Sequence, residues 1–278
     1  MLHPLQLVQP PLPAKPPGKM RGDEKLAERE RRVISLVGGG GKTTTMYALA
    51  EIFREEGKKV IVTTSTHLQT PPEEIRAWNI EEVRSLWKSD QIAVIGTDCE
   101  SNKNLAAGDQ AAVNQMENKK SVKKMRMPDS SFLQEVLQEA EVVLIEADGA
   151  KHLPCKVPIE KEPVIIPECT DVIAVVGMDA LGKPLEEVSF RKDLAVQFLN
   201  TSYKHLIAEE DIAKILSSVQ GARKGVEDRK YCVVLNKCDD EIRKERAAKI
   251  RSLLKEKSIE NVMITSCENR QNELKKYF

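Results

Sequence analysis

Four glycines, a lysine and three threonines follow a short apolar segment, in the order "GGGGKTTT" at positions 38–45. Glycines between a strand and a helix let backbone N–H groups turn toward an anion, and the first turn of the helix favours negative charge. Lys42 would place a positive charge on the β- and γ-phosphates of a nucleotide, and the Thr43 hydroxyl would bind Mg²⁺. The run therefore predicts a phosphate-binding loop, whose nucleotide-binding residues would be Gly38, Gly39, Gly40, Gly41, Lys42, Thr43 and Thr44.

This loop departs from the common phosphate-loop pattern, G-x-x-x-x-G-K-[ST]. That pattern requires a glycine at position 36, where this chain has Leu36. A shorter pattern, G-G-x-G-K-[ST], fits residues 38–43. A dinucleotide-binding fingerprint does not fit, because Thr43 occupies the position of its last glycine. A tight strand-to-helix turn that needs positive φ angles is the alternative that involves no ligand.

A second stretch, "VVLIEADG" at positions 142–149, ends an apolar strand with two acids. A carboxylate at a strand end beside the phosphate loop can hold Mg²⁺ directly or through water. Glu146 and Asp148 alternate with Ala147, so they would share one face if the strand continues past Glu146. We therefore predict Lys42, Glu146 and Asp148 as catalytic residues and Thr43, Glu146 and Asp148 as metal ligands. A buried strand that ends in a polar turn is the alternative.

A third stretch, "VVLNKCD", fits the pattern N-K-x-D directly after an apolar strand. The Asp239 carboxylate can accept hydrogen bonds from two adjacent donors on the edge of guanine, and adenine has no such pair at that edge. Asn236 would tie this loop to the phosphate loop, and the Lys237 stem would cover the plane of the base. Asn236, Lys237 and Asp239 therefore complete the predicted nucleotide site, with GTP favoured over ATP.

Weaker candidates lie near these motifs. The hydroxyl cluster at positions 63–66, followed by His67, either senses the γ-phosphate or caps a strand. His152 and Cys155 are too sparse a pair to indicate a metal site. Arg191 either reaches a phosphate or forms a surface salt bridge.

These motifs lie in an alternation of strands and helices. The alternation predicts an α/β fold, with a mostly parallel sheet between helices in the three-layer arrangement of P-loop proteins. The first strand, helix and second strand form a right-handed crossover unit. Strands are predicted at 31–38, 58–67, 91–98, 141–149, 171–177, 231–237 and 261–267, and helices at 42–57, 73–88, 131–140, 193–200, 209–219 and 240–257.

The chain divides into a leader and one domain. Residues 1–32 are rich in proline and then in charge, which predicts a disordered leader. Residues 33–278 form a single P-loop nucleotide-binding domain, with a surface excursion around 99–129 that is rich in turn-forming residues. The excursion carries a basic cluster that is either a solvated face or a contact for polyphosphate or a partner. The cluster consists of Lys119, Lys120, Lys123, Lys124 and Arg126.

Composition excludes several classes of partner. The 278 residues are 41% hydrophobic and 31% charged, and Lys+Arg and Asp+Glu both number 43. A net charge of zero gives no overall attraction to nucleic acid or an anionic membrane. No apolar run is long enough for a membrane span, and the six cysteines contain no C-x-x-C pair. We therefore expect a cytoplasmic protein without nucleic-acid or membrane partners.

At the level of class, "GGGGKT", "EADG" and "NKCD" in this order resemble the P-loop GTPases that handle metals and cofactors. That class includes nickel-insertion and cobalamin-type metallochaperones, which often use E-x-x-G, as in Glu146 to Gly149 here. Some relatives place an extra lysine before the first glycine, but this chain has Val37 there.

Longer segments carry a closer resemblance, and they are "ISLVGGGGKTTTMYALA", "VTTSTH", "LIEADGAKHLPCKVP", "EPVIIP", "VIAVVGMDALGKPL" and "VVLNKCD". Through these segments, the chain from about Val33 resembles the accessory proteins of selenium-dependent molybdenum hydroxylases, the YqeC type. This resemblance implies a P-loop nucleotide-binding protein that helps to mature selenium-containing molybdenum enzymes. One departure concerns Phe190-Arg191, where the family tends to have His-Arg.

The leading functional hypothesis is therefore a Mg²⁺-dependent nucleoside triphosphatase that acts as an accessory factor in the maturation of these hydroxylases. Its partners would be GTP or ATP and a molybdenum hydroxylase or its maturation machinery. One alternative is an ATP-dependent ligase or kinase, because the loop also resembles those of Mur-type peptide ligases. Another is a nucleotide-gated scaffold with negligible turnover. The sequence leaves open the cargo, the oligomeric state and whether selenium is handled directly.

Overall fold

The computed structural model describes residues 31–99 and 123–278. The predicted disordered leader up to residue 30 and the stretch 100–122, with Lys119 and Lys120, lie outside these residues. Within the described ranges, no helix is both long and apolar enough to cross a membrane.

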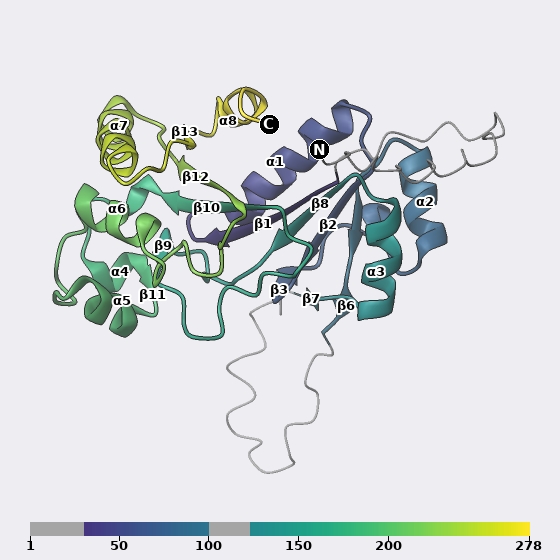
Figure 1. Cartoon of the computed structure of the whole chain (residues 1–278), viewed down its shortest axis with the longest axis horizontal. Coiled ribbons are helices and arrows are strands. Elements are labelled where there is room, and N and C mark those ends of the chain that lie inside the picture. Colours follow the sequence, from purple (N-terminus) through teal and green to yellow (C-terminus); the bar gives the residue numbers. More distant parts are fainter. Residues whose placement is uncertain (1–30, 100–122) are drawn as a thin grey trace, which may run out of the picture.

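A central sheet of eight strands organises the described residues (Figure 1). The order is β13-β12-β10-β1-β8-β2-β5-β4, and every pairing in this sheet is parallel. The predicted α/β fold with a mostly parallel sheet between helices is thus confirmed. The strands are β1 Arg32–Gly38, β2 Val60–Thr64, β4 Arg76–Ala77, β5 Ala93–Ile95, β8 Val142–Glu146, β10 Asp171–Gly177, β12 Lys230–Asn236 and β13 Val262–Ile264.

Helices cover both faces because the strand side chains alternate between two hydrophobic cores. In β1, Val33 and Val37 belong to one core, and Ile34 and Leu36 belong to the other. Helices α1 and α8 pack on the core that contains Leu36, and the remaining helices pack on the opposite core. The helices are α1 Lys42–Glu55, α2 Ile80–Lys88, α3 Ser130–Glu139, α4 Leu185–Val188, α5 Lys192–Leu199, α6 Glu209–Ser217, α7 Glu241–Lys255 and α8 Arg270–Lys275.

The position of β1 in the middle of the sheet decides where ligands can bind. It pairs with β10 on one side and β8 on the other, and β12 follows β10. In a parallel sheet the carboxyl ends of the strands share one edge, where the connecting loops form a crevice. The loops after β1, β8, β10 and β12 therefore meet at this edge.

The predicted helix at 73–88 is wrong in its first half. The chain instead forms a 3₁₀ turn, η1 (Glu73–Ile75), and then β4, which pairs with β5 at the edge of the sheet. Helix α2 begins at Ile80 because Asn79 Oδ1 accepts a hydrogen bond from the Glu82 N–H at 3.0 Å. Glu82 Oε2 in turn accepts from the Trp78 N–H at 2.7 Å. This reciprocal cap stops the helix from extending backward.

The predicted surface excursion contains, near its end, a strand with one buried side chain. Strand β7 (Lys124–Arg126) pairs antiparallel with both β3 (His67–Gln69) and β6 (Thr97–Asp98). Met125 is fully buried in the core of the α1 face, although its two neighbours are exposed. The predicted second strand is also split, because β2 ends at Thr64 and β3 leaves the main sheet.

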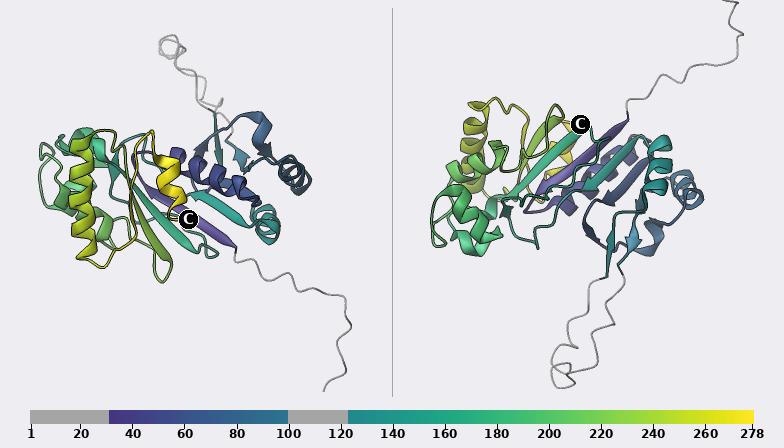
Figure 2. Two further views of the ribbon diagram at one scale, coloured as in Figure 1. Left: turned by 90° about the horizontal axis from the view of Figure 1, so that it is seen from above. Right: turned by 60° about the horizontal axis from the view of Figure 1, so that its bottom comes forward.

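The last described residues return to the start of β1. Helix α8, which the sequence analysis did not predict, lies beside α1 (Figure 2). The Phe278 ring makes an edge contact with the Phe53 ring at 6.1 Å, and the Arg32 guanidinium lies 4.9 Å from the Phe278 ring centre. These contacts cover the amino-terminal end of β1.

The buried position of Met125 gives a first prediction. Met125→Ala should lower the free energy of unfolding by about 2–5 kcal/mol, because the cavity would lie inside a close-packed core. Urea denaturation measures the change. Lys124→Ala, on the exposed side of the same strand, should change the free energy of unfolding by less than about 0.5 kcal/mol. Equal effects of the two substitutions would contradict the packing of β7.

Candidate functional site

The glycine run forms a tight loop between β1 and α1. Gly40 has φ 71°, and a side chain there would meet the backbone of Gly177, so this position requires glycine. The Gly39 N–H donates to Val175 O and the Gly40 N–H to Leu153 O, both at 2.9 Å. These bonds fix the first half of the loop. The N–H groups at the start of α1 have no partner inside the helix and are the ones that can bind an anion.

Lys42 lies at the centre of this loop and is 4% exposed. Its Nζ donates to Gly38 O at 2.6 Å and lies 3.1 Å from Asp148 Oδ1 and 3.9 Å from Glu146 Oε1. The ammonium group therefore stands between the loop backbone and two carboxylates. The three predicted catalytic residues are brought together, although their roles stay predictions.

Thr43 and the two acids also converge. Thr43 Oγ1 donates to Glu146 Oε2 at 2.6 Å, and the Gly38 N–H donates to Asp148 Oδ2 at 3.1 Å. Strand β8 ends at Glu146, so strand alternation does not explain why both acids contact Lys42. The Ala147 N–H still donates to Leu36 O at 2.9 Å, which keeps the chain beside β1 for one more residue.

The oxygen atoms of this cluster suit Mg²⁺. This ion takes oxygen ligands and is commonly held by one or two carboxylates together with substrate phosphates and water. The Thr43 hydroxyl and the Glu146 carboxylate are in contact, and the buried Asp148 Oδ1, which accepts no hydrogen bond among the described residues, is ion-paired with Lys42 Nζ at 3.1 Å. Those residues contain no group of three or more His, Cys, Asp or Glu side chains arranged for a metal. A magnesium ion here would therefore need oxygen ligands from a nucleotide and water.

Burial raises the pKa of the Glu146 carboxyl above its usual value, and the nearby Asp148 charge adds to the increase. Lys42 and the hydrogen bond from Thr43 oppose this shift without cancelling it. Tyr47, one helical turn after Thr43, has its pKa raised to about 12 by burial and by the Glu146 charge. The phenol therefore stays protonated beside the acids. The sequence analysis did not single out Tyr47, since a tyrosine at a helix position is typical of core packing.

An ion-pair chain, which the sequence analysis missed, leads outward from the acids. Lys156 Nζ lies 3.1 Å from Asp148 Oδ2 and 2.6 Å from Glu162 Oε2, and it donates to Gly149 O. Arg191 binds both oxygens of Glu162, at 2.6 and 2.9 Å. The Lys156 side chain is only 1% exposed. We call Asp148, Lys156, Glu162 and Arg191 the ion-pair chain.

A small two-stranded sheet assembles the ion-pair chain. Strand β9 (Cys155–Lys156) pairs with β11 (Ser189–Phe190), which places Lys156 opposite Phe190 and next to Arg191. Burial acts to raise the pKa of Glu162, but hydrogen bonds from Arg191 and Lys156 outweigh it, and this pKa is lowered. Glu162 is therefore held as a carboxylate. Arg191 forms the salt bridge considered from the sequence and contacts no residue of the phosphate loop.

The N-K-x-D residues lie beside the phosphate loop. Asn236 is 1% exposed, and its Nδ2 donates to Gly40 O at 2.8 Å. Its Oδ1 accepts from Thr265 Oγ1 at 3.0 Å, which ties in the loop after β13. Lys237 has φ 63° and its Nζ contacts Asp179 Oδ2 at 2.7 Å, at the 3₁₀ turn η3 (Met178–Ala180).

Asp239 is anchored on one side and open on the other. Its Oδ1 accepts from the Cys267 N–H at 2.8 Å, and its side chain is 40% exposed. Its Oδ2 is 3.9 Å from Arg243 Nη1, which is beyond hydrogen-bond distance. A carboxylate oxygen is thus free to accept a bond from a ligand, at a position linked to the phosphate loop through Asn236. The binding roles of these residues stay predictions.

Three of the weaker candidates, Thr63, Thr64 and Cys155, have structural partners. Thr63 Oγ1 donates to Ile95 O at 2.9 Å and Thr64 Oγ1 to Glu146 O at 2.8 Å, so both hydroxyls hold neighbouring strands together. Cys155 is buried with its Sγ against Val188 O at 3.5 Å, whereas His152 is exposed. These two residues do not form a joint site.

A comparison with family models decides the relationship of this chain to known proteins. The model described as YqeC protein matches residues 34–193. The chain belongs to the YqeC family. The match covers the phosphate loop, the acids after β8 and the ion-pair chain, and it confirms the resemblance to YqeC-type proteins.

A curated relative and two solved structures were also found. The relative, named "Uncharacterized protein YqeC", is from Escherichia coli (strain K12) and is 29% identical over 219 residues, which cover 72% of this chain and 73% of the relative. HypB from Helicobacter pylori, solved in complex with nickel, has a TM-score of 0.41 at 10% identity, covering 91% of this chain and 88% of that one. The MinC:MinD cell division complex of Aquifex aeolicus has a TM-score of 0.37 at 12% identity, with coverages of 87% and 85%.

The raised pKa of Glu146 gives a second prediction. The folded, metal-free protein keeps this proton at pH values where the unfolded chain has lost it, so the Glu146 contribution to stability falls as the pH rises above 4.5. Glu146→Gln removes this titration. The free energy of unfolding of the variant should therefore increase relative to wild type as the pH rises from acidic to neutral, and urea denaturation at a series of pH values measures it.

Glu135→Gln, on the exposed side of α3, is the matched control for this experiment. Its difference in stability from wild type should not grow with pH in the same way. A difference between Glu146→Gln and wild type that stays constant across the range would contradict the shifted titration.

Proposed function

We propose that this YqeC-family protein binds a nucleoside triphosphate with Mg²⁺ and hydrolyses it slowly. One observation carries the proposal: the buried Lys42 ammonium lies between the glycine loop and the Glu146 and Asp148 carboxylates, at the first turn of α1. An ammonium group and free helix N–H groups at one point form an anion site. The family match is consistent with a nucleotide-binding protein.

In this proposal each residue has a separate task. The N–H groups of Lys42, Thr43 and Thr44 and the Lys42 side chain bind the phosphates and stabilise negative charge on the transferred phosphoryl group. Thr43 and one of the two acids hold Mg²⁺, which supplies positive charge to the β- and γ-phosphate oxygens. Arg191, the arginine that the sequence analysis considered for a phosphate contact, is held by Glu162, and we expect turnover to be slow until a partner binds.

We further propose that the base is guanine. The open Asp239 oxygen can accept hydrogen bonds from the ring N–H and the amine of guanine. The Asn236–Gly40 hydrogen bond fixes the N-K-x-D segment, residues 236–239, which we call the base loop, against the phosphate loop. The Lys237 ammonium binds Asp179, which leaves its alkyl stem to pack against the base. ATP is the alternative nucleotide.

The biological role that we propose is that of a cytoplasmic accessory factor in the maturation of selenium-dependent molybdenum hydroxylases. The support for this role is the resemblance of the motif segments together with membership of the YqeC family. The protein partner would be such a hydroxylase or its maturation machinery.

Asp239 allows a test by exchange of specificity. Asp239→Asn places an amide N–H₂ opposite the guanine donors, so GTP affinity should fall about tenfold or more. Xanthosine triphosphate has a carbonyl in place of the guanine amine and can accept from that amide, so its affinity should rise relative to GTP. Calorimetric titration of GTP, xanthosine triphosphate and ATP at one Mg²⁺ concentration measures both changes.

Asp240→Asn is the matched control, because Asp240 is the neighbouring acid and caps α7 through a bond that asparagine can also make. It should leave the order of the three affinities unchanged. If wild type binds ATP as tightly as GTP and Asp239→Asn changes neither, guanine recognition is excluded while nucleotide binding stands.

Lys42 tests the phosphate site and separates the rival reactions. Lys42→Ala should weaken Mg²⁺–nucleotide binding about tenfold or more, since it removes a buried charge from the phosphates, whereas exposed Lys124→Ala should not.

Phosphate release by wild-type protein alone supports a triphosphatase. Release that strictly requires an added acceptor supports a ligase or kinase. Nucleotide-dependent capture of a hydroxylase without turnover supports a scaffold.

A further inference from the structure

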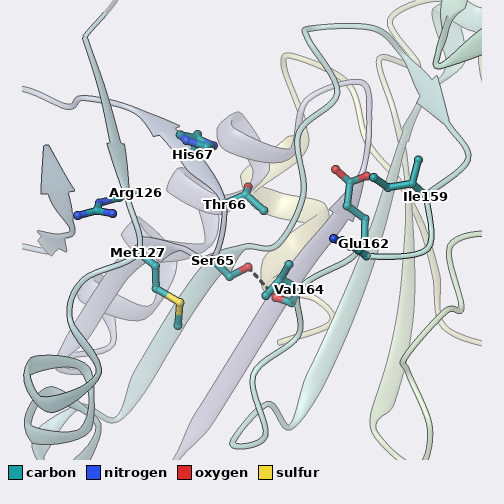
Figure 3. A pocket seen from close by; sticks show the side chains of 9 residues that line it. Ser65, Thr66, His67, Arg126, Met127, Ile159, Glu162 and Val164 are labelled. Atoms are coloured by element: carbon teal, nitrogen blue, oxygen red, sulfur yellow. Dashed lines mark hydrogen bonds between the residues drawn. The ribbon is translucent and has the colours of Figure 1, made fainter. Parts of the chain in front are cut away.

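A pocket of about 650 Å³ lies next to the ion-pair chain, outside the phosphate loop (Figure 3). One wall comes from the start of β3 with the two residues before it and from the end of β7 with the residue after it, and the other wall comes from the chain between β9 and β10. A cleft of this volume is typical of small-molecule sites. The lining residues are Ser65, Thr66, His67, Arg126, Met127, Ile159, Lys161, Glu162 and Val164.

Positive charge dominates the polar lining. His67 and Arg126 are direct cross-strand partners in β3 and β7, so their side chains are neighbours on one wall. Arg126 and Lys161 are exposed, and neither has an ion-pair partner among the described residues. The one acid of the lining, Glu162, is already bound by Lys156 and Arg191. The pocket therefore presents unpaired cations and a neutralised carboxylate.

The remaining lining combines a hydroxyl that links the walls with apolar surface. Ser65 Oγ donates to Val164 O at 2.6 Å and braces the two walls (Figure 3). Met127 and Ile159 add apolar contact surface.

We propose that this pocket binds a small organic anion as a second ligand beside the nucleotide. Its phosphate or carboxylate group is held by Arg126 and His67, and its aromatic or aliphatic body lies against Met127 and Ile159. Arg126 can bind such a group through two parallel N–H bonds. The site does not depend on the proposed nucleotide function, because none of its residues belongs to the phosphate loop or the base loop.

The pocket is joined to the phosphate loop through Glu162. Glu162 lines the pocket and also binds Lys156, which contacts Asp148, which in turn contacts Lys42. The ion-pair chain thus connects one lining residue of the pocket with the residues around Lys42, while no residue of the phosphate loop lines the pocket.

Phenyl phosphate is a suitable probe, because it joins one phosphate group to a flat apolar ring. Calorimetric titration of the nucleotide-free, full-length protein should show saturable binding of phenyl phosphate and none of neutral phenol at the same concentrations. Arg126→Gln should weaken phenyl phosphate binding about tenfold, since a charge-assisted hydrogen bond is lost. Lys124→Gln removes the same charge from the same strand outside the pocket and should leave the affinity unchanged.

Two further measurements make the result decisive. Lys42→Ala should leave phenyl phosphate binding within about threefold of wild type; a larger loss would place the probe on the phosphate loop and overturn the proposal. Equal affinity of wild type and Arg126→Gln, or no saturable binding in wild type, would also overturn it. Mg²⁺–GTP titration of Arg126→Gln should still show binding, so a failure of the pocket is distinguishable from a failure of the nucleotide site.

Discussion

Two buried lysines share one buried aspartate, and the architecture of the site depends on this arrangement. Asp148 lies 3.1 Å from both Lys42 and Lys156, and all three side chains are almost completely buried. An isolated charge in this position would be very costly, so each ion is stable only because the others are present. Glu146 and Glu162 complete the balance at the two ends. The protein thus maintains a preorganised charge cluster at the point where its central strands end.

The sheet order explains how residues from distant segments reach this cluster. Placing β1 between β8 and β10 sets the glycine loop beside the acids on one side and the Asn236 loop on the other. The loops fill the crevice at the carboxyl edge, and the small β9–β11 sheet brings Lys156 against them from outside. The helices mainly cover the two faces, while strand ends and loops supply most of the chemistry.

The sequence predicts those parts of the site that are local patterns. The glycine run, the acids after β8 and the N-K-x-D segment each combine a short motif with a strand end, so their convergence follows from parallel topology. The ion-pair chain was not predictable from the sequence. Lys156 and Glu162 are brought to Arg191 only by the pairing of β9 with β11, which no local motif indicates. The error at 73–88 has a local cause, since helical periodicity hid the Asn79 cap that starts α2. Likewise, Met125 lies among turn-forming residues, so the sequence did not indicate that its side chain is buried.

The hydrogen bond from Asn236 to Gly40 joins positions 196 residues apart in the chain. Contacts of such separation form late in folding, because the closure of a long loop is entropically unfavourable until much of the structure is in place. A growing polypeptide that has already made the glycine loop still lacks the residue that braces it. The brace on the glycine loop therefore forms only once β12 has joined the sheet.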